Sequence, residues 1–103
     1  MRIVWSPLAV QRLREAVEYI ARDKQGAAER WVGGAFEAVG RLAELPQSGR
    51  VVPELGRPDI REVIYGIYRI IYRVSPEAVL VLTVCHGRQL IDETEVERSQ
   101  SAC

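Results

Sequence analysis

The run REVIYGIYRIIYRVSPEAVLVLTVC, residues 61–85, decides the fold of this chain. It is rich in Val, Ile, Leu, Tyr and Thr, the residues that suit a pleated and half-buried strand. Gly66 and the sequence Ser75-Pro76-Glu77 divide it into three strand-like segments, 61–65, 67–74 and 78–85. Because the connections are short, we expect the three strands to form an antiparallel meander.

Residues ahead of this run show helical periodicity. Ser6 followed by Pro7 is typical of a helix start, and apolar residues then recur every three or four positions over 7–22. After a break at Asp23-Lys24-Gln25-Gly26, a second apolar face extends over 28–43 until Pro46. Two helices joined by about four residues must lie antiparallel.

The order of elements predicts an α+β domain over residues 1–91, with the helical hairpin on one face of the sheet. Residues 2–5 form a further short strand, which we expect to pair with a strand from the far end of the chain. Residues 46–59, with three prolines and two glycines, predict a long ordered loop. Residues 92–103 are acidic and almost free of apolar side chains, so we expect a solvated or frayed tail.

The composition excludes several functional classes. Fourteen basic side chains, thirteen of them Arg, balance fourteen acidic ones among 103 residues, which excludes a histone-like nucleic-acid binder. Cys85 lies in an apolar run and is expected to be a core thiol, and no cysteine pair or histidine cluster supports a metal site. The sequence has no nucleotide-binding glycine loop, hydrolase motif, signal peptide or membrane span, so we expect a cytoplasmic protein without a cofactor.

Alternation along strand 67–74 places Arg69 and Arg73 on one face and the tyrosines on the other. If the helices cover the tyrosines, the two arginines stand on the open face. Arg61 on the preceding strand and Arg88 after the last strand are expected to join them, which gives an anion-attracting surface. The alternative is that alternating arginines simply solvate the wet face of an antiparallel sheet.

His86 is the only histidine and ends the last strand. Beside an arginine cluster it is a candidate general acid or base, while the plainer interpretation is a surface residue that makes hydrogen bonds. Glu54 and Glu62 are further candidates by location only, and they form no recognisable carboxylate pair.

Several local strings together are more specific than a fold class. They are W-S-P-x-A at 5–9, E-Y-I at 18–20, L-x-x-L-P-x-S-G-R-x-V-P-E-L at 42–55, I-R-E-V-I-Y-G-I-Y-R-I-I-Y-R-V at 60–74 and V-x-H-G-R at 84–88. In their order and spacing they resemble the ParE branch of the RelE/ParE toxin superfamily, over residues 3–91. The family fold, β-α-α-β-β-β, agrees with the periodicity.

The resemblance implies a toxin of a type II toxin-antitoxin pair that inhibits DNA gyrase, is not an enzyme and is neutralised in a complex with a ParD-like antitoxin. It implies neither membrane association nor sequence-specific DNA binding by the toxin alone. Acidic residues of the antitoxin would pair with exposed arginines, Arg69 and Arg73 first, with Arg61 and Arg88 as further contacts.

Two alternatives stay open. The sister RelE branch cleaves mRNA on the ribosome, and here Arg61, Arg69 and His86 would be its catalytic residues. The loop before the sheet has no Lys, and Gly87 rather than an aromatic residue follows His86, which weakens that chemistry. A decayed toxin that only binds its antitoxin is the other alternative.

Overall fold

The structure, a computed structural model of the chain, describes residues 1–101. Its helices are α1 (Pro7–Asp23), α2 (Gln25–Gly40) and α3 (Glu93–Ser101), with a short 3-10 turn, η1, over Arg41–Ala43. Its strands are β1 (Arg2–Trp5), β2 (Arg50–Val51), β3 (Ile60–Tyr65), β4 (Tyr68–Val74) and β5 (Ala78–His86). The predicted α+β class is confirmed.

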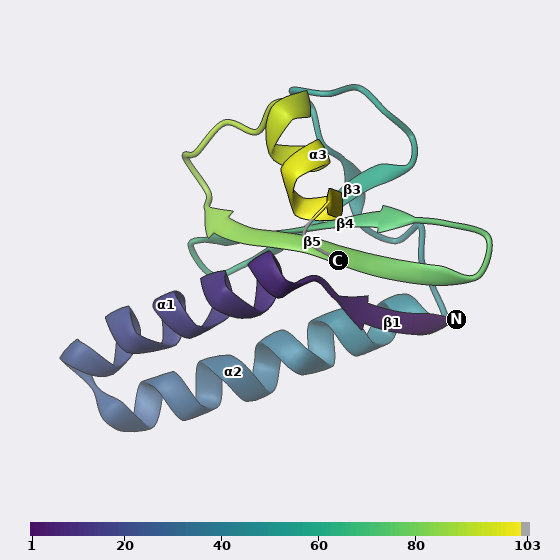
Figure 1. Cartoon of the computed structure of the whole chain (residues 1–103). Helices are drawn as coiled ribbons and strands as arrows, with labels where there is room; N and C mark the ends of the chain where they lie inside the picture. The colour runs from purple at the N-terminus through teal and green to yellow at the C-terminus, as the bar shows by residue number, and fades with distance from the viewer. Residues whose placement is uncertain (102–103) are drawn as a thin grey trace.

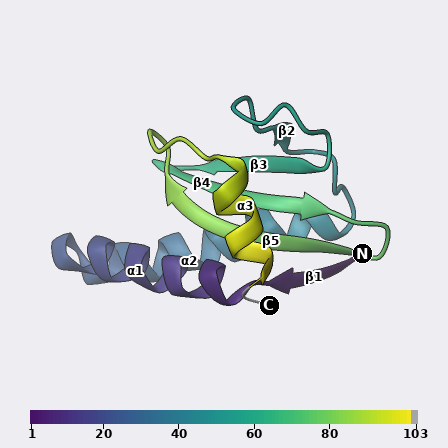
Figure 2. The same ribbon diagram turned by 45° about the horizontal axis from the view of Figure 1, so that its top comes forward.

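The strands form one five-stranded sheet in the order β1-β5-β4-β3-β2 (Figure 2). The predicted meander is confirmed, because β3, β4 and β5 pair antiparallel. Residues 2–5 do pair with the far end of the chain, as β1 runs parallel to β5. Gly66, with φ of +60°, begins the two-residue turn between β3 and β4, where a type II′ turn requires glycine first.

The helical hairpin of α1 and α2 lies along one face of the sheet, and α3 lies on the opposite side (Figure 1). The predicted start of α1 is confirmed: the Ser6 hydroxyl accepts a hydrogen bond from the Ala9 amide at 3.0 Å. The same hydroxyl donates to the Leu82 carbonyl at 2.7 Å, so one buried side chain caps the helix and ties it to β5.

Each face of the sheet has its own apolar cluster. The hairpin side buries Ile70, Tyr72, Val79 and Val81 against residues of α1 and α2 such as Ala9, Ala35 and Val39. The α3 side buries Val52, Ile60, Ile71, Leu82, Cys85, Ile91 and Val96. The helical hairpin therefore covers the tyrosine face of β4, which was the condition for an open arginine face, but a second layer also covers the other face.

The structure corrects three expectations about the elements. Lys24 alone separates α1 from α2, so the helical hairpin is tighter than a four-residue break implies, and α2 ends at Gly40 before η1. The loop over 46–59 contains the short strand β2. Just after this strand, Val52 is buried and its amide donates to the Ile60 carbonyl of β3 at 3.2 Å, which holds the loop against the sheet.

The third correction concerns the acidic tail. Over 93–101 it is the helix α3 rather than a solvated or frayed segment, and residues 102–103 lie outside the described part. The Asp92 carboxylate accepts the Glu95 amide at 2.9 Å, as an N-capping residue does. Val96 is 1% exposed, and it joins the cluster on this face together with Ile91. Val96, with Ile91 in the segment just before the helix, thus supplies the apolar contact of an otherwise polar helix with the sheet.

Candidate functional site: the arginines of the sheet and its edges

Arg69 in β4 is the most constrained cation of the described chain. Its side chain is 4% exposed, and its Nε donates to Glu62 Oε1 at 2.5 Å. Its Nη1 and Nη2 donate to the two carboxylate oxygens of Glu54 at 2.6 and 2.9 Å, and Nη1 also donates to the Gln89 carbonyl at 2.7 Å. The guanidinium therefore joins the loop, β3 and the segment after β5.

The electrostatics of this cluster follow from its geometry. The hydrogen bonds from Arg69 lower the pKa of Glu54 to about 2, although partial burial opposes the shift. The same contacts raise the pKa of Arg69 above its usual value. Glu62 has a fully buried side chain and is also paired with Arg50 at 2.5 Å, so two guanidinium groups compensate one buried carboxylate.

The open arginine face expected from the sequence does not form at Arg69. Its partners, Glu54 and Glu62, do not follow from strand alternation alone, but the sequence carries a signal for Glu62. A two-residue turn at Gly66 sets Glu62 opposite Ile71 and Ile64 opposite Arg69, so Glu62 and Arg69 are diagonal neighbours on one face. Glu54 gives no such signal, because it belongs to the loop.

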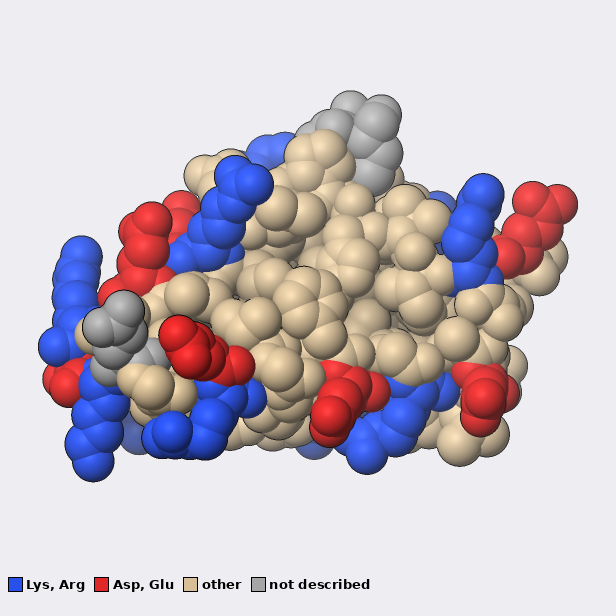
Figure 3. All heavy atoms as spheres, turned by 90° about the horizontal axis from the view of Figure 1, so that it is seen from below, with Lys and Arg blue, Asp and Glu red and all other residues tan. Residues whose placement is uncertain are grey.

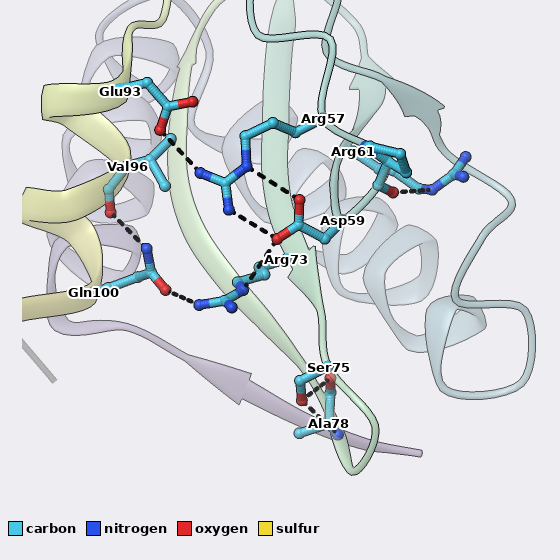
Figure 4. A network of polar contacts seen from close by, with 10 residues as sticks. Arg57, Asp59, Arg61, Arg73, Ser75, Ala78, Glu93, Val96 and Gln100 are labelled. Atoms are coloured by element: carbon cyan, nitrogen blue, oxygen red, sulfur yellow. Dashed lines mark hydrogen bonds and ion pairs between the residues drawn. The ribbon is translucent and has the colours of Figure 1, made fainter.

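Arg73 shares the face of Arg69 but belongs to another polar network, which fastens α3 (Figure 4). Arg57 holds both carboxylate oxygens of Asp59, at 3.1 and 2.9 Å, and pairs with Glu93 of α3 at 2.9 Å. Arg73 lies 3.3 Å from Asp59 and donates to the Gln100 side chain. The hydrogen bonds from Arg57 lower the pKa of Asp59, so this carboxylate stays charged beside the two arginines.

Arg61 and Arg88 do not join Arg69 and Arg73 in one surface. Arg61 is directly opposite Tyr72, so it lies on the hairpin face, and it donates to the carbonyls of Pro58, Gln47 and Gly49. Arg88 is exposed, and within residues 1–101 its side chain has no hydrogen bond or ion pair. The expected four-arginine cluster is therefore wrong, because register and loop folding separate its members.

His86 lies on the hairpin face, opposite Tyr68 in the register, with ring centroids 6.4 Å apart. Its Nδ1 accepts a hydrogen bond from the Arg88 amide at 3.1 Å. A cleft of 240 Å³ adjoins it, lined by Arg12, Glu15, Ala16, Tyr68, Val84, Cys85, His86 and Gln89. Since Arg69 faces the other side of the sheet, the set Arg61, Arg69 and His86 does not converge on one reacting group.

The surface of the helical hairpin carries charges of both signs around a broad uncharged area (Figure 3). That face lacks, over its described residues, the continuous basic stripe that follows a nucleic-acid backbone. Among residues 1–101, none of the helices has the length and hydrophobicity of a membrane-spanning segment. Among residues 1–101 no group of three His, Cys, Asp or Glu is placed to hold a metal ion.

Cys85 is the buried thiol that the sequence predicts. Its residue is 6% exposed, and burial raises the pKa of the thiol to about 11. A thiol in that state is a poor nucleophile, so Cys85 contributes packing rather than chemistry.

Comparisons with known proteins agree on one family. The family model described as "ParE toxin of type II toxin-antitoxin system, parDE" matches residues 3–91. The "Putative toxin Y4kP" of Sinorhizobium fredii is 42% identical over 91 residues, which cover 85% of this chain and 90% of that protein. The solved chromosomal ParDE system from P. aeruginosa shares the fold, with a TM-score of 0.69 and 19% identity over 84% of this chain and 95% of that one. The chain belongs to the ParE toxin family of type II toxin-antitoxin systems.

Proposed function

We propose that this ParE-family toxin acts in the cytoplasm by binding and inhibiting DNA gyrase, without catalysis, and that a ParD-like antitoxin neutralises it in a heteromeric complex. The family assignment supports this target and this partner. The fold likeness to a chromosomal ParDE system agrees with the same assignment.

The observation that carries the non-enzymatic part of the proposal is the state of Arg69. In the nuclease alternative Arg69 would have to contact a phosphate, whereas Arg69 is 3% exposed and already donates to two carboxylates and a carbonyl. Releasing it would leave the Glu62 carboxylate with one partner fewer in a buried site, which is costly. This favours a structural role for Arg69 over contact with RNA or with an antitoxin.

Among the four arginines, Arg88 and Arg73 are better suited to meet a partner. Arg88 is exposed without a side-chain partner within residues 1–101, and the Arg73 side chain keeps 41% of its surface exposed. An acidic segment of an antitoxin, or of the target, would gain charge-assisted hydrogen bonds there. Arg61 is bound to backbone carbonyls and is the weaker candidate.

The test adds the purified toxin, freed of antitoxin, to a gyrase supercoiling and DNA-cleavage assay and to a ribosome-dependent mRNA cleavage assay. We expect loss of supercoiling and accumulation of cleaved DNA, with mRNA intact. His86→Ala should retain this inhibition, because His86 has no catalytic task in the proposal. Cleavage of mRNA with gyrase unaffected would instead establish the nuclease, and a toxin inactive in both assays would be a decayed one.

A further inference from the structure

Two exposed loops meet at the end of the sheet that lies away from the N-terminus (Figure 1). One is the turn between β3 and β4, residues 66–67, and the other is the segment 87–90 that follows β5. The Gly87 amide donates to the Ile67 carbonyl at 2.7 Å, and a Cβ at residue 87 would lie only 3.1 Å from that oxygen. This close contact joins the two loops into one projection, residues 66–67 and 87–90, which we call the apex.

The apex holds large apolar side chains in water. Leu90 is 79% exposed, more than any other large apolar residue in the described part of the chain, and Ile67 is 57% exposed. Single exposed apolar residues are common on protein surfaces and need no explanation. Two of them on joined loops form an apolar tip, and covering it would remove apolar surface from water.

The backbone on both sides of Leu90 is fixed by the buried ion cluster. The Gln89 carbonyl accepts a hydrogen bond from Arg69 at 2.7 Å, and the Ile91 amide donates to Glu54 at 3.1 Å. Ile91 is itself buried in the apolar cluster under α3. Leu90 is thus an exposed side chain on an ordered backbone, so a partner that binds it pays little for ordering the loop.

The charge at the apex is positive. Residues 66–67 and 87–90 contain no Asp or Glu, and Arg88 is their only charged residue. Arg88 is exposed, and across residues 1–101 no carboxylate or carbonyl pairs with its side chain. A guanidinium beside an apolar tip complements a partner surface that offers a carboxylate next to an apolar hollow.

The shape and the rigidity of the apex favour one kind of partner. A projecting, ordered tip fits a preformed concave site, and folded enzymes provide such clefts. A disordered segment that folds on binding instead wraps over a broad surface and has no cleft of its own. The apex is therefore better suited to a folded target enzyme than to a flexible antitoxin segment.

We propose that the apex is the surface with which the toxin binds gyrase, inserting Leu90 and Ile67 into an apolar hollow of the target while Arg88 meets a carboxylate at its rim. This inference rests on the proposed function for the identity of the target. The bonds that shape the apex join backbone groups, Gly87 to Ile67 and Gln89 to the His86 carbonyl, so they persist in His86→Ala.

Gyrase supercoiling and DNA-cleavage assays on the full chain, freed of antitoxin, test the apex. Leu90→Ser should raise the toxin concentration needed for half-maximal inhibition at least tenfold, because truncating a central apolar anchor weakens an interface most. Leu45→Ser is the matched control and should leave inhibition unchanged. Leu45 is 62% exposed and lies just after Ala43, whose carbonyl binds the N-terminal amine away from the apex.

A charge reversal gives a second readout. Arg88→Glu should also weaken inhibition at least tenfold, whereas Arg14→Glu, at an exposed position of α1, should leave it unchanged. Antitoxin binding, measured by calorimetry, should stay unchanged in Leu90→Ser and Arg88→Glu, which verifies that both variants are folded.

Three results would overturn the inference alone: full inhibition by both apex variants, equal losses in the apex variants and their controls, or loss of antitoxin binding with inhibition intact. An unmodified toxin that binds its antitoxin but leaves gyrase unaffected would instead overturn the proposed target, and this inference with it.

Discussion

The phenol of Tyr72 accepts a hydrogen bond from the Gly49 amide at 3.0 Å and donates its own hydrogen to the Pro46 carbonyl at 2.8 Å. Tyr72 is fully buried in the centre of β4, so this contact fixes the start of the long loop to the sheet. A Cβ on residue 49 would lie 2.4 Å from the phenol oxygen and 2.6 Å from the Glu62 carbonyl. Glycine is therefore required at position 49 by close approach.

Gly49→Ala should destabilise the protein by about 1–3 kcal/mol, because the methyl group meets backbone as well as side-chain atoms. Tyr72→Phe should cost a similar amount, about 1–3 kcal/mol, since it leaves the Gly49 amide without its partner. Urea unfolding measures both values. Gly33→Ala is the control: its Cβ meets nothing within 4 Å in the middle of α2, so stability should rise, by about 1 kcal/mol.

The acid stability of the protein should depend on Glu54. Its pKa is about 2 in the folded state against 4.5 ordinarily, so the carboxylate contributes stability that is fully present above pH 4.5. That contribution is lost as the pH falls from 4.5 toward 2. Glu54→Gln should therefore lower the free energy of unfolding at pH 7 by roughly 2 kcal/mol, and the difference from the unmodified protein should shrink below pH 4.5.

Unfolding curves recorded at several pH values provide that comparison. Glu44→Gln is the matched control, because Glu44 is exposed and its side chain has no ion pair within residues 1–101. A Glu54→Gln deficit that stays constant across the acid range would contradict the assigned role of the carboxylate charge.

The helix α3 should depend on one apolar side chain. Val96 is 1% exposed, so Val96→Ala is expected to cost about 1–3 kcal/mol and to speed amide exchange within α3. Glu97→Ala, one position further along and exposed, should change the free energy of unfolding by no more than about 0.5 kcal/mol. It should leave amide exchange within α3 unchanged. Thermal unfolding together with hydrogen exchange tests this, and equal effects of the two changes would show that Val96 does not anchor the helix.

Cys85 should resist alkylation in the folded protein. At pH 8 its thiol, with a pKa of about 11 and little exposure, should react with iodoacetamide at least a hundredfold more slowly than after unfolding in urea. A Cys103→Ser background leaves Cys85 as the only thiol, so mass spectrometry can follow the reaction. Rapid labelling under native conditions would contradict the buried thiol.

The sequence by itself determined the elements whose signals are local. Three features depend only on neighbours within a few residues. They are the Ser6-Pro7 start of α1, the glycine turn between β3 and β4, and the period-two runs of the strands. The pairing of residues 2–5 with the last strand also followed, because a lone short strand needs a partner. Even the contact between Glu62 and Arg69 was implicit in the register that the turn sets.

The tertiary structure alone decided what covers the second face of the sheet. Glu54, Arg69 and Gln89 are far apart in the chain, and only the folding of the loop and of the segment after β5 brings them together. The docking of α3 is also decided by tertiary structure, since it depends on the burial of Val96 and on the ion pair between Arg57 of the loop and Glu93. Because Arg69 is buried on that face, it binds carboxylates and a carbonyl of its own chain instead of an external anion. The physical reason is that a guanidinium removed from water must be matched by carboxylates, and the loop that supplies Glu54 is placed by tertiary folding rather than by any local periodicity.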